Sequence, residues 1–268
     1  MKNLVKGALE EDLAVAGDVT SKAIFTSETD KFNIVSKDTG ILCGMDVVRD
    51  VFDEVDPEVA VTFLKSDGDE LTPGTLIAVI SGKVRSILTA ERTALNFLSH
   101  LSGIATKTHT YTLAAKKAVI LDTRKTIPGL RELEKYAVAC GGGRNHRMGL
   151  YDMVMIKDNH IDAAGGIPQA VARIRDMWGD RYKIEVEART LEEVRLALDS
   201  EADRIMLDNM SLQMMKEAVI IVGGKAETEA SGNVTLEKIA SIADTGVDFI
   251  SIGGLTHTVT AFDFSLRK

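Results

Sequence analysis

The amino-acid sequence predicts an α/β protein with two parts, a mixed N-terminal part and a C-terminal part that forms a parallel barrel. Two observations support this prediction. Residues 1–103 alternate short strand signals with Asp-Gly and Pro-Gly turns, which is typical of small antiparallel sheets. From about residue 118 onward, short apolar strands alternate with helical segments, which is typical of βαβ units and a parallel sheet.

In the N-terminal part, two strand-rich segments precede a long helix. Residues 31–52 pass from strand-like alternation through a glycine turn into an amphipathic helix, and residues 59–84 alternate strand and turn signals. Residues 88–117 have apolar side chains at helical spacing and predict one long helix. A break in this helix is expected near Gly103.

The C-terminal part contains six predicted strands, which is most of a barrel but fewer than eight. They lie at 118–123, 152–159, 183–188, 204–209, 227–232 and 248–254. Helical segments are predicted at 128–142, 165–179, 190–200, 211–224 and 235–247. Thr190 and Glu193 have the spacing of a capping box, whereas Thr235 is followed at that spacing by Lys238.

The residues that end these six strands are sorted by chemical type. Cations follow the first two strands, carboxylates end the next two, and small residues end the last two. The carboxyl ends of parallel barrel strands share one face, and active sites are built there. Solvated loops would explain one or two polar endings, but six sorted endings indicate a functional site.

Five cationic side chains at the first two strand ends predict a pocket for an anion. They are Arg124, Lys125, His146, Arg147 and Lys157. Arginine binds carboxylate or phosphate through a planar fork, and lysine adds a compact charge. Together the five would repel one another unless a multiply charged anion lay among them. Any one of them alone would pass as a surface cation, and we interpret Arg144 as such.

The glycine run at 141–143 is weak evidence for a phosphate loop, because the closing Gly-Lys-Ser/Thr of a P-loop is absent. We interpret it as the end of a helix after Cys140 that allows close backbone packing. Cys140 lies near a helix C-terminus, without a setting that favours the thiolate, and is interpreted as structural.

Glu187 and Asp208 end neighbouring strands and could together hold one hard cation such as Mg²⁺. Either acid alone would be an ordinary strand-end carboxylate. Glu185 alternates with Glu187 and points the same way along its strand, so the pattern leaves the choice between these two open.

The last two strand ends, at 229–233 and 251–257, predict a phosphate site, because glycines let backbone N–H groups approach an anion. Ser231 and His257 add side-chain donors. His160 is either an orienting neighbour of the site or a polar strand exit. The two histidines of the long helix, His100 and His109, are interpreted as packing or surface residues.

Composition excludes several classes of function. The chain has 40 Asp and Glu against 32 Lys and Arg, a formal net charge of −8, which argues against nucleic-acid and membrane-surface binding. Cys43 and Cys140 are the only cysteines and have neither zinc spacing nor a disulfide framework. The N-terminus lacks a signal-peptide core, and no apolar run approaches the roughly 20 residues of a membrane helix. We therefore expect a cytoplasmic protein.

The segment LDTRKTIPGLRELEKYAVACGGGRNHRMGLYDMVMIKDNHI at 121–161 resembles the central signature of the quinolinate phosphoribosyltransferase family, the carboxylating nicotinate-nucleotide pyrophosphorylases. The resemblance continues through IEVEARTLEEV, IMLDNMS, EASGNVTLEKI and GVDFISIGGLTHTVTAFDFSL. Upstream, LEEDLAVAGDVTS, LTPGT and AERTALNFLSHLSGIAT also match, so the resemblance covers essentially the whole chain.

This resemblance implies an N-terminal α/β sandwich domain at 1–103 and an open, about seven-stranded α/β barrel at 104–263. A C-terminal tail at about 264–268 would return to the first domain. The resemblance also implies a homodimer in which Arg92 completes the partner's site, and a further assembly into a hexamer of dimers. From the pattern alone, Arg92 would be a helix surface charge.

The implied activity is phosphoribosyl transfer from phosphoribosyl pyrophosphate to quinolinate with decarboxylation, giving nicotinate mononucleotide, pyrophosphate and CO₂ in NAD biosynthesis. The resemblance assigns quinolinate binding to Arg92, Arg124, Lys125, Thr126, His146, Arg147 and Lys157. It assigns phosphoribosyl pyrophosphate to Glu187, Asp208, Ser231, Gly232, Asn233, Gly253, Gly254 and His257. Glu187 and Asp208 would also meet Mg²⁺, and the catalytic residues would be these two acids with Lys125 and Lys157. Either lysine could protonate the ring carbon after decarboxylation.

Four alternatives stay open at this point. A phosphoribosyltransferase that acts on nicotinate would need fewer cations, and the molybdenum-associated paralogue of the family fits the run RNHRMGLYDMVMIKDNH less well. A non-catalytic binder of anionic metabolites would not need paired acids. A metal-dependent barrel hydrolase that uses Glu187, Asp208 and His160 would leave the cations unexplained.

Overall fold

The structure, a computed structural model, describes residues 1–268, and the chain divides into two compact units. The first unit comprises Met1–His109, Ile127–Gly142 and Thr258–Lys268, and the second comprises Thr110–Thr126 and Gly143–His257. The chain therefore leaves the second unit after Thr126 and re-enters it at Gly143. None of its helices combines the length and the apolar character needed to cross a membrane.

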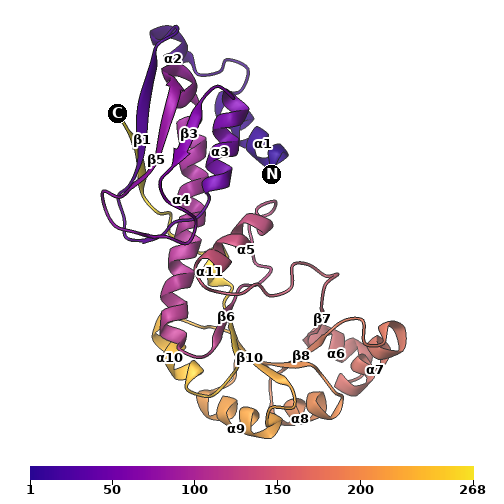
Figure 1. Cartoon of the computed structure of the whole chain (residues 1–268). Coiled ribbons are helices and arrows are strands. Elements are labelled where there is room, and N and C mark those ends of the chain that lie inside the picture. The colour runs from indigo at the N-terminus through magenta and orange to yellow at the C-terminus, as the bar shows by residue number, and fades with distance from the viewer. The chain divides into compact units, whose positions relative to one another are not determined.

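The first unit is built on a four-stranded antiparallel sheet with the order β12-β1-β5-β3 (Figure 1). Its strands are β1 (Thr29–Ser36), β3 (Ala60–Phe63), β5 (Leu76–Lys83) and β12 (Phe264–Arg267). The last strand of the chain thus pairs with the first. A separate two-stranded ladder joins β2 (Gly40–Ile41) to β4 (Glu70–Leu71).

The helices of the first unit are α1 (Lys2–Leu13), α2 (Val19–Ile24), α3 (Met45–Val55), α5 (Arg131–Cys140) and most of α4 (Val84–Ala115). α4 runs for 32 residues without interruption, so the break expected near Gly103 does not occur. A Cβ at Gly103 would lie 2.3 Å from the carbonyl oxygen of Thr260. The glycine therefore lets the C-terminal segment pack against the helix, and it does not kink the helix.

Cys43 and Cys140 meet in the first unit, beside Asp67, with their ligand atoms within 4.8 Å of one another. The hydrogen bond from Cys43 to Cys140, together with burial, raises the pKa of Cys43 well above its usual range. The same bond lowers the pKa of Cys140. The prediction that Cys140 lacks a setting that favours the thiolate is therefore wrong, because a sequence cannot show that a second thiol donates to it.

The second unit contains a parallel six-stranded sheet with the order β6-β11-β10-β9-β8-β7. The strands are β6 (Val119–Leu121), β7 (Val154–Ile156), β8 (Ile184–Ala188), β9 (Arg204–Asp208), β10 (Glu227–Ser231) and β11 (Phe249–Ser251). All six predicted strands are confirmed. The helices are α6 (Asp158–Ala164), α7 (Ile167–Trp178), α8 (Leu191–Asp199), α9 (Leu212–Val222), α10 (Leu236–Ala243) and α11 (Gly254–His257). Helices α7 to α10 line the outside of the curved sheet (Figure 1).

A seventh strand, which the resemblance implies, is reduced to a single bridge beside β6. Arg144 pairs in parallel with Leu121, and its N–H donates to the carbonyl of Ile120 at 2.8 Å. The ladder stops there because the next residues turn to bond a side chain, as described below. The sheet is therefore an open barrel of six strands, and the backbone of Arg144 lies at its edge while its side chain is exposed.

Period-two alternation sets what faces the inside of this barrel. Along β8, Ile184, Val186 and Ala188 are fully buried on one side. Glu185 and Glu187 point to the other side, the interior of the barrel. Since a buried charge must be paired, the acids on this inner face predict a network of polar contacts.

Candidate active site

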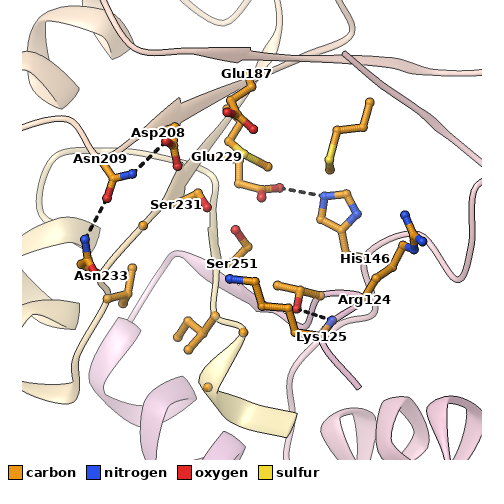
Figure 2. Close-up of a pocket in the computed structure, with 18 of the residues that line it drawn as sticks. Arg124, Lys125, His146, Glu187, Asp208, Asn209, Glu229, Ser231, Asn233 and Ser251 are labelled. Atoms are coloured by element: carbon orange, nitrogen blue, oxygen red, sulfur yellow. Dashed lines mark hydrogen bonds and ion pairs between the residues drawn. The ribbon is translucent and has the colours of Figure 1, made fainter. Parts of the chain in front are cut away.

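A cavity of about 1010 Å³ opens at the carboxyl ends of the strands of the second unit. Each of the six strands contributes residues to its lining, at or just after its carboxyl end. The cavity therefore lies on the face where the strand endings predicted it. Figure 2 shows the side chains of Lys125, Glu229, Ser231 and Ser251 around the same hollow.

The structure brings most of the expected site residues together. The cavity is lined by Arg124, Lys125, His146, Arg147, Lys157, Glu187, Asp208, Ser231, Gly232, Asn233, Gly253, Gly254 and His257. Thr126 and Arg92 do not line it. Thr126 is half-buried beyond Lys125, and Arg92 is an exposed residue of α4 in the first unit.

A buried acid at the end of β6 anchors the segment that carries two of the cations. Asp122 is fully buried, and its Oδ1 accepts the backbone N–H of His146 at 2.8 Å. Its Oδ2 accepts the Asn145 side-chain amide at 2.6 Å. These two bonds turn the chain after Arg144 and direct residues 146 and 147 into the cavity.

His146 is held at both ring nitrogens. Nε2 lies 3.0 Å from Glu185 Oε2 and 3.3 Å from Glu229 Oε2, and both acids are fully buried (Figure 2). Nδ1 accepts the backbone N–H of Arg147 at 2.7 Å. Arg204 Nη1 donates to Glu229 Oε2 at 3.2 Å and supplies a balancing charge. Sequence reasoning missed the part played by Glu229, although its alternation with Ser231 along β10 places both on the inner face.

The charges of this cluster shift its titration. Burial alone would lower the pKa of His146, but the two carboxylates outweigh it and raise the pKa from 6.5 to about 9. Protonation must also break the bond from the Arg147 amide into Nδ1, which opposes the rise. Burial and the charge of Glu229 raise the pKa of Glu185 to about 7.

The arginine next to His146 is held in a partly buried position. Arg147 Nη1 donates to the carbonyl of Met153 at 3.2 Å. Burial and the nearby charge of Arg124 lower the pKa of Arg147. Two guanidinium groups in one cavity with mutual repulsion form a site that an anion would stabilise.

Lys157 Nζ donates to Glu187 Oε2, between the ends of β7 and β8. His160, which does not line the cavity, accepts the backbone N–H of Lys157 through Nδ1 at 3.0 Å. His160 is thus part of the capping box that begins α6 next to Lys157, and its role in the site stays a prediction. Glu187 lines the cavity and Glu185 does not. This favours Glu187 as the acid that would meet a metal, a choice that the alternation along β8 left open.

The two acids expected to hold a metal lie on neighbouring strands and line the same cavity. Asp208 Oδ2 accepts the amide of Asn209 at 2.8 Å, and Asn209 Oδ1 accepts the amide of Asn233 at 3.0 Å (Figure 2). Carboxylate oxygens with solvent access and space beside them are the donors that Mg²⁺ takes. The residues present therefore fit a hard divalent cation.

The last two strand ends carry glycines that lie close to neighbouring side chains. Gly232 has φ of 96°, and a Cβ there would lie 2.2 Å from Asn209 Oδ1. A Cβ at Gly253 would lie 2.8 Å from the Lys125 side chain. A side chain at either position would displace a neighbour, Asn209 or Lys125, that also lines the cavity. Lys238 of α10 also lines the cavity and adds a cation that the sequence interpretation had missed, because it was read only as an imperfect cap.

Most of the chain matches the models of one protein family. A family model described as Quinolinate phosphoribosyl transferase, C-terminal domain, matches residues 104–267, and the corresponding N-terminal domain model matches residues 18–102. The chain is 46% identical over 287 residues to a decarboxylating quinolinate phosphoribosyltransferase (2b, mitochondrial) of Nicotiana tabacum, covering 100% of this chain and 82% of that protein. It is 46% identical, with the same coverage, to a carboxylating nicotinate-nucleotide pyrophosphorylase (chloroplastic) of Arabidopsis thaliana.

Among solved structures, the nicotinate-nucleotide pyrophosphorylase from Francisella tularensis superimposes with a TM-score of 0.96 at 43% identity. The match covers 99% of this chain and 95% of that one. The similarity therefore extends over both units of the chain and not only over the barrel.

Proposed function

The chain belongs to the quinolinate phosphoribosyltransferase family, and from this premise we propose how the residues of the cavity carry out the family's reaction. The activity is that of a carboxylating nicotinate-nucleotide diphosphorylase, a pentosyltransferase. Quinolinate and phosphoribosyl pyrophosphate give nicotinate mononucleotide, a step of NAD biosynthesis. The observation that carries the residue assignment is the convergence of cations, acids and glycines from six strand ends on one cavity.

The cationic side of the cavity binds quinolinate, which carries two adjacent carboxylates. Arg124 and Arg147 present guanidinium forks, and Lys125 and Lys157 add compact charges. The dianion attracts all four cations, and this attraction offsets their mutual repulsion. The same contacts direct the pyridine nitrogen at C1 of the ribose and hold the two reactants in a near-attack geometry.

The opposite side of the cavity binds phosphoribosyl pyrophosphate. Ser231, Gly232 and Asn233 from the end of β10 hold the 5-phosphate with Gly253, Gly254 and His257 from the end of β11. Glycines in the cavity lining at both strand ends support this assignment, since a backbone without side chains leaves room for phosphate at its N–H groups. Lys238 lies on the same side and adds a positive charge.

Glu187 and Asp208 would hold Mg²⁺ together with the ribose hydroxyls. When bound, the metal supplies charge neutralisation for the departing pyrophosphate. The two carboxylates also stabilise the positive charge that develops on the ribose as its bond to pyrophosphate breaks. Their place at the ends of adjacent strands supports this role.

The decarboxylation follows from the first step. Attack by the ring nitrogen makes the ring cationic, so the electron pair left by the C2 carboxylate is stabilised when CO₂ leaves. That carbon then takes a proton, from Lys125 or Lys157. Lys157 is bonded to Glu187 in the free protein and must exchange this partner for the substrate.

Arg92 is assigned to the site of a second copy of the chain in a homodimer. Its exposure on α4 and its absence from the cavity lining of its own chain support this assignment. Mixing an Arg92→Ala variant with a Lys157→Ala variant tests it. Shared sites predict that the mixture regains activity that neither variant has alone, and a mixture as inactive as its components would contradict the shared site.

A direct assay tests the proposed reaction as a whole. The protein is incubated with quinolinate, phosphoribosyl pyrophosphate and Mg²⁺, and the release of CO₂ and the formation of nicotinate mononucleotide are measured together. Equal amounts of both products are expected, with none when nicotinate replaces quinolinate. The expected cytoplasmic location stays a prediction, because the plant relatives carry mitochondrial and chloroplastic in their names.

A further inference from the structure

Two fully buried carboxylates on the inner side of the cavity have no part in the substrate contacts proposed above. They belong to Glu185 on β8 and Glu229 on β10. Both have side-chain exposures of 0%, so each requires a specific partner inside the protein. The partner they share is the His146 ring, through Nε2.

We propose that Glu185 and Glu229 are positioning residues for quinolinate binding, which act by holding His146 and, through it, Arg147. This inference rests on the proposed function. The two acids contact neither the reacting atoms nor the metal in this account. Their role is to fix where the ring lies, and the ring in turn fixes the backbone of the neighbouring arginine.

The two buried acids hold the His146 ring in place. Nε2 lies within 3.0 and 3.3 Å of two carboxylate oxygens. These are ion-pair contacts, so the two acids hold the ring by electrostatic attraction at short range. A rotated ring would leave two buried charges without their partner, at a high free-energy cost.

The second step leads from the ring to the arginine. Arg147 follows His146 directly in the chain, so a ring held in place also restricts the Arg147 backbone. In the neutral ring, Nδ1 adds a bond by accepting the Arg147 N–H at 2.7 Å. The other end of Arg147 is tied to the carbonyl of Met153 at 3.2 Å. The guanidinium is thus located from both ends, and a displacement of about 1 Å in such a group weakens its contribution by as much as about 100-fold.

A metal ion is the alternative occupant, since His146, Glu185 and Glu229 have ligand atoms within 4.8 Å of one another. The charges argue against it. Arg204 already donates to Glu229 at 3.2 Å, and Arg147 carries a second positive charge on the residue after His146. A divalent cation here would be repelled by both arginines, with twice the charge that even a protonated imidazole carries.

Glu229→Gln and Glu185→Gln test the proposal, with Glu227→Gln as the matched control. Glu227 lies on the same strand and accepts Arg204 Nη2 at 2.9 Å, but it has no contact with His146. We expect KM for quinolinate to rise about 10- to 100-fold in the first two variants, with KM for phosphoribosyl pyrophosphate changed less than about twofold. The control should keep both values of the wild type.

A double-mutant cycle with His146→Ala separates positioning from a general loss of stability. If the acids act through the ring, Glu229→Gln should have no further effect on KM for quinolinate once the ring is gone. A slowly exchanging Nε2–H proton resonance of His146 is expected in the NMR spectrum of the wild type and should be lost in Glu229→Ala. Should Glu185→Gln fail to fold, the Glu229 cycle and this resonance decide the matter.

Three outcomes would overturn the inference: wild-type KM for quinolinate in Glu229→Gln, additive effects in the cycle, or an equal loss in Glu227→Gln. These are distinct from failure of the proposed function. A wild-type protein that forms no nicotinate mononucleotide would remove the reaction itself, whereas an active wild type with unaffected variants would remove only the positioning role.

Discussion

Lys157 donates a hydrogen bond to Glu187 across the carboxyl ends of β7 and β8. Glu187 is 10% exposed in its side chain and Lys157 is 43% exposed, so the pair lies at the boundary between protein and cavity. The bond couples the proposed quinolinate side of the cavity to the proposed metal side. Substrate and metal must together replace it, which makes occupancy of one side favour occupancy of the other.

Replacing Arg147 tests the quinolinate side. Arg147→Ala should raise KM for quinolinate about 100-fold, because a pair of charge-assisted hydrogen bonds contributes roughly 3 kcal/mol. Steady-state kinetics with each substrate varied in turn measures this. Arg144→Ala is the control, since this nearby arginine has an exposed side chain. Wild-type kinetics in Arg147→Ala would remove this residue from the pocket.

Asp208→Ala tests the metal side. We expect kcat/KM for phosphoribosyl pyrophosphate to fall about 100-fold while the circular dichroism spectrum stays that of the wild type. Added Mg²⁺ should recover part of the activity, because the remaining acid binds the metal more weakly. Asp199→Ala, at an exposed position of α8, serves as the control. Full rate with ordinary Mg²⁺ dependence in Asp208→Ala would argue against the role.

The pH dependence of stability should reflect His146. Its pKa is raised in the folded protein from 6.5 toward about 9. A group whose pKa is raised on folding stabilises the fold at pH values below its pKa in the unfolded chain, near 6.5. This contribution is lost as the pH rises toward 9. Urea unfolding of the wild type and of His146→Gln should therefore show a difference in the free energy of unfolding that shrinks between pH 6 and pH 9, about the two pKa values.

His109→Gln, in the first unit, is the control for this measurement. A difference between wild type and His146→Gln that grows with pH would mean that the ring is held neutral. In that case the bond from the Arg147 amide outweighs the carboxylates.

Alanine substitutions at two glycines with positive φ distinguish the cost of backbone strain from the cost of a steric clash. Gly232→Ala should destabilise the protein by about 2–4 kcal/mol and raise KM for phosphoribosyl pyrophosphate, since φ is 96° and a Cβ would meet Asn209 Oδ1. Gly224→Ala has φ of 76° with nothing within 4 Å, so it should cost only about 1 kcal/mol. Thermal unfolding and kinetics compare the two. Equal losses in both would contradict a close approach at Gly232.

The two cysteines should differ in reactivity. Cys140 is half-buried and its pKa is lowered by the hydrogen bond from Cys43, whereas Cys43 is fully buried with a raised pKa. Iodoacetamide should therefore modify Cys140 first, as peptide mass spectrometry would show. Cys43→Ala should slow the reaction of Cys140 at neutral pH, because it removes the hydrogen-bond donor that lowers the pKa of Cys140. Faster or unchanged alkylation would mean that the thiol pair does not set the reactivity.

The sequence was sufficient to predict the barrel strands and most residues of the cavity. Parallel strands bury apolar runs and end on a common face, so Lys157, Glu187 and Asp208 could be placed there without coordinates. The partners of the buried acids were harder to predict. Glu229 lies inside a strand, where alternation shows only that its side chain points inward. Its contact with His146 joins residues 83 positions apart and has no local signal.

Two other features could not be predicted from the sequence pattern. Gly103 reads as a helix break, but its purpose is a contact with Thr260, which only the folded chain brings near. Arg92 reads as an ordinary surface charge, since a partner's site has no signature in one chain. The roles of Thr126 and Arg92 remain predictions, as does the division of the chain at residue 103.

The excursion of the chain between Thr126 and Gly143 has a consequence for dissecting this protein. Helix α5 belongs to the first unit, where Leu133, Ala137 and Val138 are buried and His100 bonds to Glu134 at 2.8 Å. If the gene were divided at the junction of the two family models, α5 would stay with the barrel half. Its apolar face would then be exposed to solvent. The barrel is thus not a free-standing module, and shuffling or truncation experiments should exchange both halves together.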